Sequence, residues 1–188
     1  MAETTRGVET RVNPERIDHP VLAFVLNYWN DKRGERAMPS RGEILPSELR
    51  SHLGWIVMTD VLPGLDDFRY RLIGTLVGQY FFRDATGKTI REAFVTWPRP
   101  AIDGIVAIHR KCARDRAVLY TFGQADWMNQ GYEEFHSLYL PLSDDSLNCN
   151  VILNAFVFDR AKVLMARAIA QAKSEPPRQI PALALRED

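Results

Sequence analysis

The sequence predicts an α+β fold: a five-stranded antiparallel sheet with helices on one face, and a flanking helix near each end of the chain. Strand patterns occur in two runs, first a pair and then a group of three, with a helical block between them. Runs of this kind favour antiparallel pairing. The 188 residues are 46% hydrophobic and 26% charged, which is typical of a globular domain. A chain of this length can fold without a disulfide or a metal ion.

The first 17 residues carry mixed charges without a hydrophobic period, so we expect a flexible N-terminal arm over 1–17. A helix is predicted from Asp18 to Arg33, because Pro20 suits a first helical turn. This helix has two apolar stripes, formed by Leu22, Val25, Leu26 and Trp29 and by Val21, Phe24 and Tyr28.

A helix that is apolar on two sides needs to be buried on both. One side can pack on its own domain, and the other can pack on a second copy of the chain. We therefore expect a homodimer whose interface includes Val21, Phe24, Val25 and Tyr28.

Residues 37–54 contain two prolines and two glycines and are predicted to be a connector with a short helix at 46–49. Residues 55–62 are rich in β-branched side chains, and 68–73 alternate apolar and basic residues. The short turn between these two strands predicts an antiparallel hairpin.

The segment 75–116 is predicted to be mostly helical, with a short helix at 75–82 and a loop at 86–89. Thr89 is suited to cap a helix over 90–94. A longer helix at 101–115 follows, and His109 lies on its apolar stripe.

Three strands are predicted at 118–128, 132–142 and 149–158. The last is almost continuously apolar, as a central strand covered on both faces would be. A final helix is expected at 160–173, followed by a disordered tail. The domain would then span 18–160, with the helix and tail in 161–188.

Charge and cysteine content exclude several classes of protein. Lys and Arg balance Asp and Glu at 24 each, which argues against nucleic-acid binding through bulk positive charge. Cys112 and Cys149 are too few for a disulfide scaffold and lack the spacing of a zinc site. The start has no apolar core of signal-peptide length, and no apolar run is long enough to span a membrane. We expect a cytoplasmic protein without bound metal, nucleic acid or membrane insertion.

Four short segments carry a family resemblance: Met38–Arg41, Phe68–Leu72 followed by Gly74-Thr75, Arg83-Asp84 with Thr86–Lys88, and Pro141–Asp145. In this order and spacing, the chain resembles the single-domain PAS-like family of alphaproteobacteria, from about residue 20 to 160. The resemblance implies a five-stranded antiparallel PAS sheet, a sensory or interaction role, and no particular ligand or cofactor.

In a PAS fold, the helix at 101–115 and the sheet would enclose a cavity. Side chains predicted to line it are Tyr80, Phe94, Trp97, Ile105, His109, Tyr120, Phe122, Phe135 and Tyr139. Aromatic residues of this kind bind flat or apolar ligands, or simply form a filled core.

His109 allows two interpretations. Some PAS sensors bind haem through a histidine on this helix, and a neutral imidazole is a good iron ligand. The alternative is a core histidine bonded to a backbone carbonyl or a hydroxyl. Nearby, Arg110, Lys111, Arg114 and Arg116 outnumber Asp115 and form either a solvated helix end or a site for an anionic ligand or an acidic partner.

Catalysis has weak support. Glu133 and Glu134 point to opposite faces of a strand, so they cannot share a site. His136 lies on the same face as Glu134 and allows an acid–base pair. The enzyme hypothesis is a catalytic site that uses His136 or His109. We expect a non-enzymatic PAS-type module that binds a small ligand or a signalling protein. The alternatives are a ligand-free interaction adaptor with a filled core and a haem sensor using His109.

Overall fold

The computed structural model describes residues 3–5, 8–81, 85–124 and 134–159. Within them, one antiparallel sheet is the centre of the fold, in the order β1-β2-β5-β6-β7-β3-β4. Its strands are β1 (Glu3–Thr5), β2 (Val8–Val12), β3 (Ile56–Val61), β4 (Phe68–Ile73), β5 (Leu119–Gln124), β6 (Glu134–Leu142) and β7 (Val151–Asp159). The predicted α+β class and antiparallel pairing are confirmed.

The five predicted strands correspond to β3–β7, and the long β6–β7 ladder pairs Glu134 with Asp159 at one end and Leu142 with Val151 at the other. Two more strands extend this sheet beyond β5. The prediction of a flexible arm over 1–17 is wrong for residues 3–5, which form β1, and for residues 8–12, which form β2 and pair with β5. Its alternation of Val and Thr with charged residues is a strand pattern.

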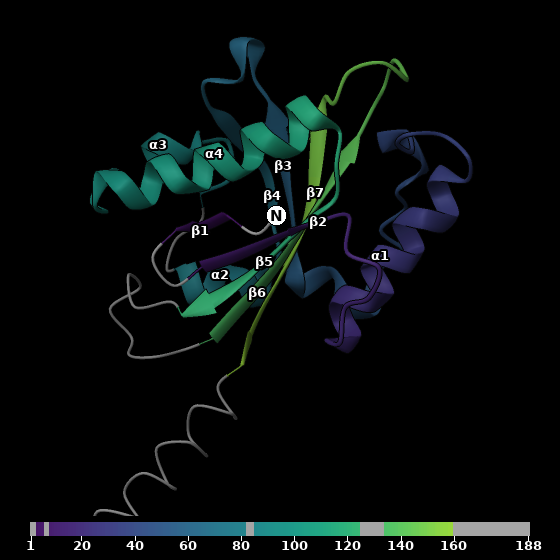
Figure 1. Ribbon diagram of the computed structural model, residues 1–188, viewed down its shortest axis with the longest axis horizontal. Coiled ribbons are helices and arrows are strands. Elements are labelled where there is room, and N and C mark those ends of the chain that lie inside the picture. The colour runs from purple at the N-terminus through teal and green to yellow at the C-terminus, as the bar shows by residue number, and fades with distance from the viewer. Residues whose placement is uncertain (1–2, 6–7, 82–84, 125–133, 160–188) are drawn as a thin grey trace, which may run out of the picture.

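Helices cover both faces of the sheet. Figure 1 shows α3 and α4 on one side and α1 on the other. The helices are α1 (Pro20–Arg33), α2 (Thr75–Phe81), α3 (Ile90–Ala93) and α4 (Arg99–Asp115), with 3₁₀ turns at Arg41–Glu43, Arg50–Trp55 and Pro63–Leu65. The short helix predicted at 46–49 is wrong, because this stretch is a turn between two of these 3₁₀ segments.

Helix α1 buries its first apolar stripe against the sheet. Leu22 and Val25 are fully buried, and Trp29 donates a hydrogen bond from Nε1 to the Pro141 carbonyl at 3.0 Å. Because α1 packs on β6 and β7, the chain itself covers the face of the sheet opposite α4.

The four segments that carry the family resemblance are joined in pairs by backbone hydrogen bonds between distant parts of the chain. The Ser143 amide donates to the Pro39 carbonyl at 3.0 Å, which joins Pro141–Asp145 to Met38–Arg41. The Gly87 amide donates to the Tyr70 carbonyl at 2.7 Å, and the Tyr70 amide donates to the Lys88 carbonyl at 2.9 Å. Gly87 has φ +84°, where glycine is favoured.

Gly74 is needed for a different reason. A Cβ there would overlap the backbone carbonyls of Leu53 and Gly54, so only glycine permits this close approach before α2. The helix predicted at 160–173 and the tail lie outside the described residues, and the domain limits remain predictions.

Candidate functional site

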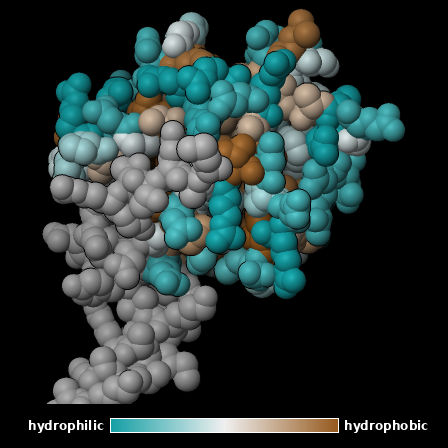
Figure 2. Space-filling view, viewed as in Figure 1, coloured by the Kyte–Doolittle hydropathy of each residue, from teal (hydrophilic) through white to brown (hydrophobic). Residues whose placement is uncertain are grey.

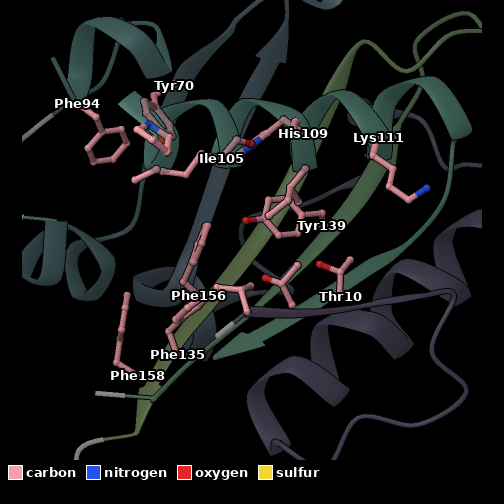
Figure 3. A pocket seen from close by; sticks show the side chains of 17 residues that line it. Thr10, Tyr70, Phe94, Ile105, His109, Lys111, Phe135, Tyr139, Phe156 and Phe158 are labelled. Carbon is pink, nitrogen blue, oxygen red and sulfur yellow. The ribbon is translucent and has the colours of Figure 1, made fainter. Parts of the chain in front are cut away.

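A cavity of about 380 Å³ lies between α4 and the sheet. Figure 3 shows its side chains converging from α4, from β2 and from the central strands. It is lined by Val8, Thr10, Tyr70, Phe94, Pro100, Ala101, Gly104, Ile105, Ala107, Ile108, His109, Lys111, Thr121, Phe135, Tyr139, Phe156 and Phe158.

The side-chain periodicity of strands and helices explains why these residues face the same cavity. Alternate residues of a strand face the same side, so Phe135 and Tyr139 of β6 lie beside Phe156 and Phe158 of β7. On α4, positions three and four apart share a face, which brings Ala101, Gly104, Ile105 and Ile108 over these rings. Further along the sheet, Thr10 of β2 is the register partner of Thr121 on β5.

Gly104 enlarges the cavity on its α4 side because it has no side chain. It lies inside α4, and a Cβ built on it would meet nothing within 4 Å. Glycine inside a helix costs about 1 kcal/mol relative to alanine. This part of the cavity therefore stays open because a helical side chain is absent where one would fit.

Polar groups in the wall form a short chain. Thr121 Oγ1 and Ser137 Oγ lie 2.5 Å apart, and Ser137 Oγ donates to Tyr139 Oη at 3.5 Å. Burial raises the pKa of Tyr139 to about 12 and raises the pKa of Tyr70 further still. Both phenols are uncharged near neutral pH.

His109 is buried on α4, and its Nδ1 lies 2.8 Å from the Ile105 carbonyl. Because a carbonyl only accepts hydrogen bonds, Nδ1 carries the proton and donates. Desolvation lowers the pKa of His109 from 6.5 to about 4, so the ring is neutral. This is the core-histidine arrangement that the sequence offered as the alternative to a haem ligand.

The haem interpretation can be tested on the other ring nitrogen. Nε2 of His109 has no hydrogen-bond partner within the described residues, as an iron ligand would require. It is also fully enclosed, with the rings of Phe68 and Tyr139 centred 5.2 and 5.0 Å from the imidazole. Iron has no open approach to it, so these residues do not fit an axial haem ligand.

The structure brings together five of the nine predicted cavity residues: Phe94, Ile105, His109, Phe135 and Tyr139. Trp97 does not line the cavity but packs on Phe94, with the ring centres 4.1 Å apart. The Tyr80 side chain lies outside the described part.

Tyr120 and Phe122 face the other side of the sheet, which corrects their predicted place in the cavity. Tyr120 Oη lies 2.6 Å from Nδ1 of His136, and the Arg11 guanidinium lies 4.8 Å from the centre of the Phe122 ring. The physical reason is the period of two: Thr121, between them, is the residue that faces the cavity.

Sequence reasoning missed several cavity residues. Val8 and Thr10 were missed because their strand was taken for a flexible arm, although its alternation was visible. Phe156 and Phe158 alternate on a strand that was predicted correctly, so their shared face could have been inferred. The part of the cavity next to Gly104 could not be predicted from the sequence, where the one indication is a glycine within a helical pattern.

The predicted dimer interface is only partly available. Val25 is fully buried against the sheet, so its assignment to an interface is wrong. Tyr28 is half-buried, since its hydroxyl donates to Glu48 at 2.8 Å and accepts from the Leu45 amide at 2.9 Å. The connector 37–54 thus covers much of the second stripe. Phe24 remains 40% exposed, and Val21 is half-buried.

Figure 2 shows hydrophobic residues in small separate areas on one face of the molecule, among hydrophilic ones. His109 and His136 lie on opposite faces of the sheet, so no site could use both. Within the described ranges, no three His, Cys, Asp or Glu side chains gather to hold a metal ion. The described helices include none with the length and apolar character needed to cross a membrane.

Comparison with known proteins agrees with this architecture. A family described as "PAS domain" matches residues 17–157. The structure of the PAS domain from Bordetella pertussis BvgS is similar, with a TM-score of 0.52 and 14% identity over 68% of this chain and 92% of that one. At this identity the likeness concerns the fold alone. No curated protein matches the chain.

Proposed function

This chain belongs to the PAS domain family of sensory and interaction modules, and on that premise we propose that it is a non-enzymatic sensor that binds a small, largely apolar molecule. The observation that carries the proposal is the cavity of about 380 Å³ between α4 and the sheet. Ligand sites commonly have volumes from about 300 Å³ and predominantly apolar walls.

The same observation favours a ligand over the adaptor with a filled core. An adaptor needs no internal space, and a helix lying on a sheet would normally be close-packed. Here α4 has glycine at position 104, where a side chain would fit. The aromatic rings of Phe94, Phe135 and Phe156 offer flat apolar surface to a molecule in that space.

A signal would leave the cavity through the elements that line it. Phe156 and Phe158 belong to the end of β7, directly before residue 160, and Val8 and Thr10 belong to the N-terminal strand β2. A ligand that binds better when α4 and these strands are in one arrangement shifts the population toward that arrangement. Both ends of the domain would then report on occupancy.

The partner that receives this signal is a signalling protein or a second copy of the chain. Phe24 is the part of the predicted dimer surface that remains most exposed. Homodimer formation, a cytoplasmic location and the absence of nucleic-acid binding remain predictions.

The test uses N-phenyl-1-naphthylamine, an uncharged dye that fluoresces in apolar sites. We expect saturable binding to the full chain, and native mass spectrometry of freshly purified protein should show a retained small molecule. Gly104→Leu fills the cavity and should abolish both signals. Gly42→Leu makes the same chemical change at an exposed site and should leave them intact.

Equal dye binding by wild type and Gly104→Leu would reject the cavity as the ligand site. A Soret band after haem reconstitution, lost in His109→Ala, would instead establish the haem sensor.

A further inference from the structure

The charges around the cavity limit the ligand that it takes. Among the described residues that line it, Lys111 is the single charged side chain. His109 is neutral because desolvation holds its pKa near 4, and the phenols of Tyr70 and Tyr139 are uncharged.

Lys111 already has an acidic partner outside the aromatic part of the cavity. Its Nζ lies 3.0 Å from an oxygen of Asp115, and both side chains are one-third exposed. In Figure 3 its side chain extends away from the aromatic rings. An ionic ligand among those rings would lose its hydration without gaining a partner of opposite charge, which is strongly unfavourable.

Besides the enclosed Nε2 of His109, a second polar group of the cavity wall has unused hydrogen-bonding capacity. Tyr70 is 8% exposed and lines both this cavity and a smaller one of about 30 Å³ beside it. Its hydroxyl has no hydrogen-bond partner within the described residues, whereas buried tyrosine hydroxyls usually have one. Tyr139, in contrast, already accepts a hydrogen bond from Ser137.

The position of Tyr70 is fixed by its backbone. The Lys88 carbonyl and the Gly87 amide bond to its amide and carbonyl, and the Phe94 ring lies edge-on with its centre 6.2 Å away. The backbone of Tyr70 is thus held on both sides and its ring is packed against Phe94, which favours selection of a ligand group by position.

We propose that the cavity takes an uncharged, mostly apolar molecule carrying a carbonyl or ether oxygen, and that this oxygen accepts a hydrogen bond from Tyr70 Oη. This inference rests on the proposed ligand-binding function and adds the class of ligand. An acceptor on the ligand gives this hydroxyl the hydrogen-bond partner that the described residues do not supply.

Three probes of nearly the same shape separate the two parts of this proposal: 2-acetylnaphthalene, 2-isopropenylnaphthalene and 2-naphthoate. They are a ketone, a hydrocarbon and a carboxylate. Equilibrium dialysis against the full chain at neutral pH should show that the carboxylate binds at least about tenfold more weakly than the ketone, because its charge is unpaired in the cavity.

The variant Tyr70→Phe should weaken binding of the ketone about fivefold, as expected for loss of one neutral hydrogen bond, and leave the hydrocarbon unchanged. Tyr120→Phe removes a tyrosine hydroxyl on the opposite face of the sheet, where it lies 2.6 Å from Nδ1 of His136, and should affect neither probe. Thermal unfolding of each variant checks that the fold is retained.

Carboxylate binding as tight as that of the ketone would overturn the assignment of an uncharged ligand. Equal affinity of wild type and Tyr70→Phe for the ketone would overturn the role of Tyr70. In both cases the proposed function would stand, since a naphthalene probe still binds. Failure of all three probes and of N-phenyl-1-naphthylamine would reject the proposed function, and this inference with it.

Discussion

The two faces of the sheet are built from the same strands but are packed differently. On the α1 side, Leu22 and Val25 of the helix and Leu138 and Leu140 of β6 are completely buried. On the α4 side, Phe135 and Tyr139 of β6 and Phe156 and Phe158 of β7 border open space.

The difference lies in what each helix presents. Helix α1 has Trp29 hydrogen-bonded to the Pro141 carbonyl, so a large side chain fills the space against the sheet. Helix α4 has Ala101, Gly104 and Ala107 along the cavity. Small residues opposite rings leave a volume that the chain does not fill. The α1 side therefore supplies stability, and the α4 side is the candidate receptor for a ligand.

The largest effect should follow removal of the anchor on the filled side. We expect Trp29→Ala to lower the free energy of unfolding by about 3–5 kcal/mol, the range for a buried aromatic residue. Urea unfolding measures this loss. Trp29→Phe, which keeps most of the ring but not the Nε1 donor, should lose roughly 1–2 kcal/mol. Similar losses in the two variants would mean that packing by Trp29 is not what fills this side.

The next largest effect is the pH dependence of the free energy of unfolding that His109 causes on the α4 side of the sheet. Its pKa falls from 6.5 to about 4 on folding because burial disfavours the charged ring. The unfolded chain therefore binds a proton that the folded chain does not. This contribution to stability is present above pH 6.5 and is lost as pH falls to about 4, with a full size of about 3 kcal/mol.

His109→Gln, which cannot titrate, isolates this contribution. Urea unfolding at pH 7.5, 5.5 and 4.5 should show a smaller acid loss for His109→Gln than for wild type. Parallel pH profiles for the two proteins would show that His109 is not buried as a neutral ring.

Two isoleucines of α4 allow a comparison between a position in the packed core and a position that lines the cavity. Ile102 is 6% exposed and packs in the core, whereas Ile105 is half-buried and lines the cavity. Ile102→Ala should cost about 3 kcal/mol and Ile105→Ala about 1 kcal/mol, because Ile105 already has open space on one side. Equal costs in thermal unfolding would show that the cavity collapses around Ile105.

A smaller effect of opposite sign is expected at Gly104. Gly104→Ala adds a methyl group where no atom lies within 4 Å and improves helix propensity. It should stabilise the fold by about 1 kcal/mol, seen as a rise in melting temperature. Gly74→Ala is the contrasting variant and should destabilise, since its Cβ overlaps the Leu53 and Gly54 carbonyls. A loss of stability in Gly104→Ala would mean that the site is not open.

The smallest effect on stability is expected at the outer side of α1. Phe24 is 40% exposed and stacks on His52, with the ring centres 4.2 Å apart. Phe24→Ser should change the free energy of unfolding by less than about 0.5 kcal/mol. Sedimentation of wild type and variant then tests the dimer: a dimer weakened by this substitution supports the α1 interface, and a monomeric wild type rejects it.

Periodicity predicted much of the fold because it depends on neighbours in sequence. The apolar spacing of Leu22, Val25 and Trp29 correctly identified the buried stripe of α1. The capping of helix 90–94 by Thr89 was also predictable, and its hydroxyl accepts a hydrogen bond from the Glu92 amide. For the site, the pattern located His109 on the apolar face of α4 but placed Tyr120 and Phe122 on the wrong side of β5. An aromatic composition does not distinguish the two faces of a strand, whereas alternation does.

The sequence alone determined the helix α1, the strands β3–β7 and which side of α4 is apolar, because those properties follow from residue spacing along a single element. Tertiary structure decided three other features: that Val8–Val12 joins the sheet beside β5, that the connector covers Tyr28, and that a hollow remains under Gly104. Each of these features depends on the distance in space between two elements that are far apart in the sequence. The distance between two packed layers is set by the volumes of all the side chains between them, and no local pattern encodes it.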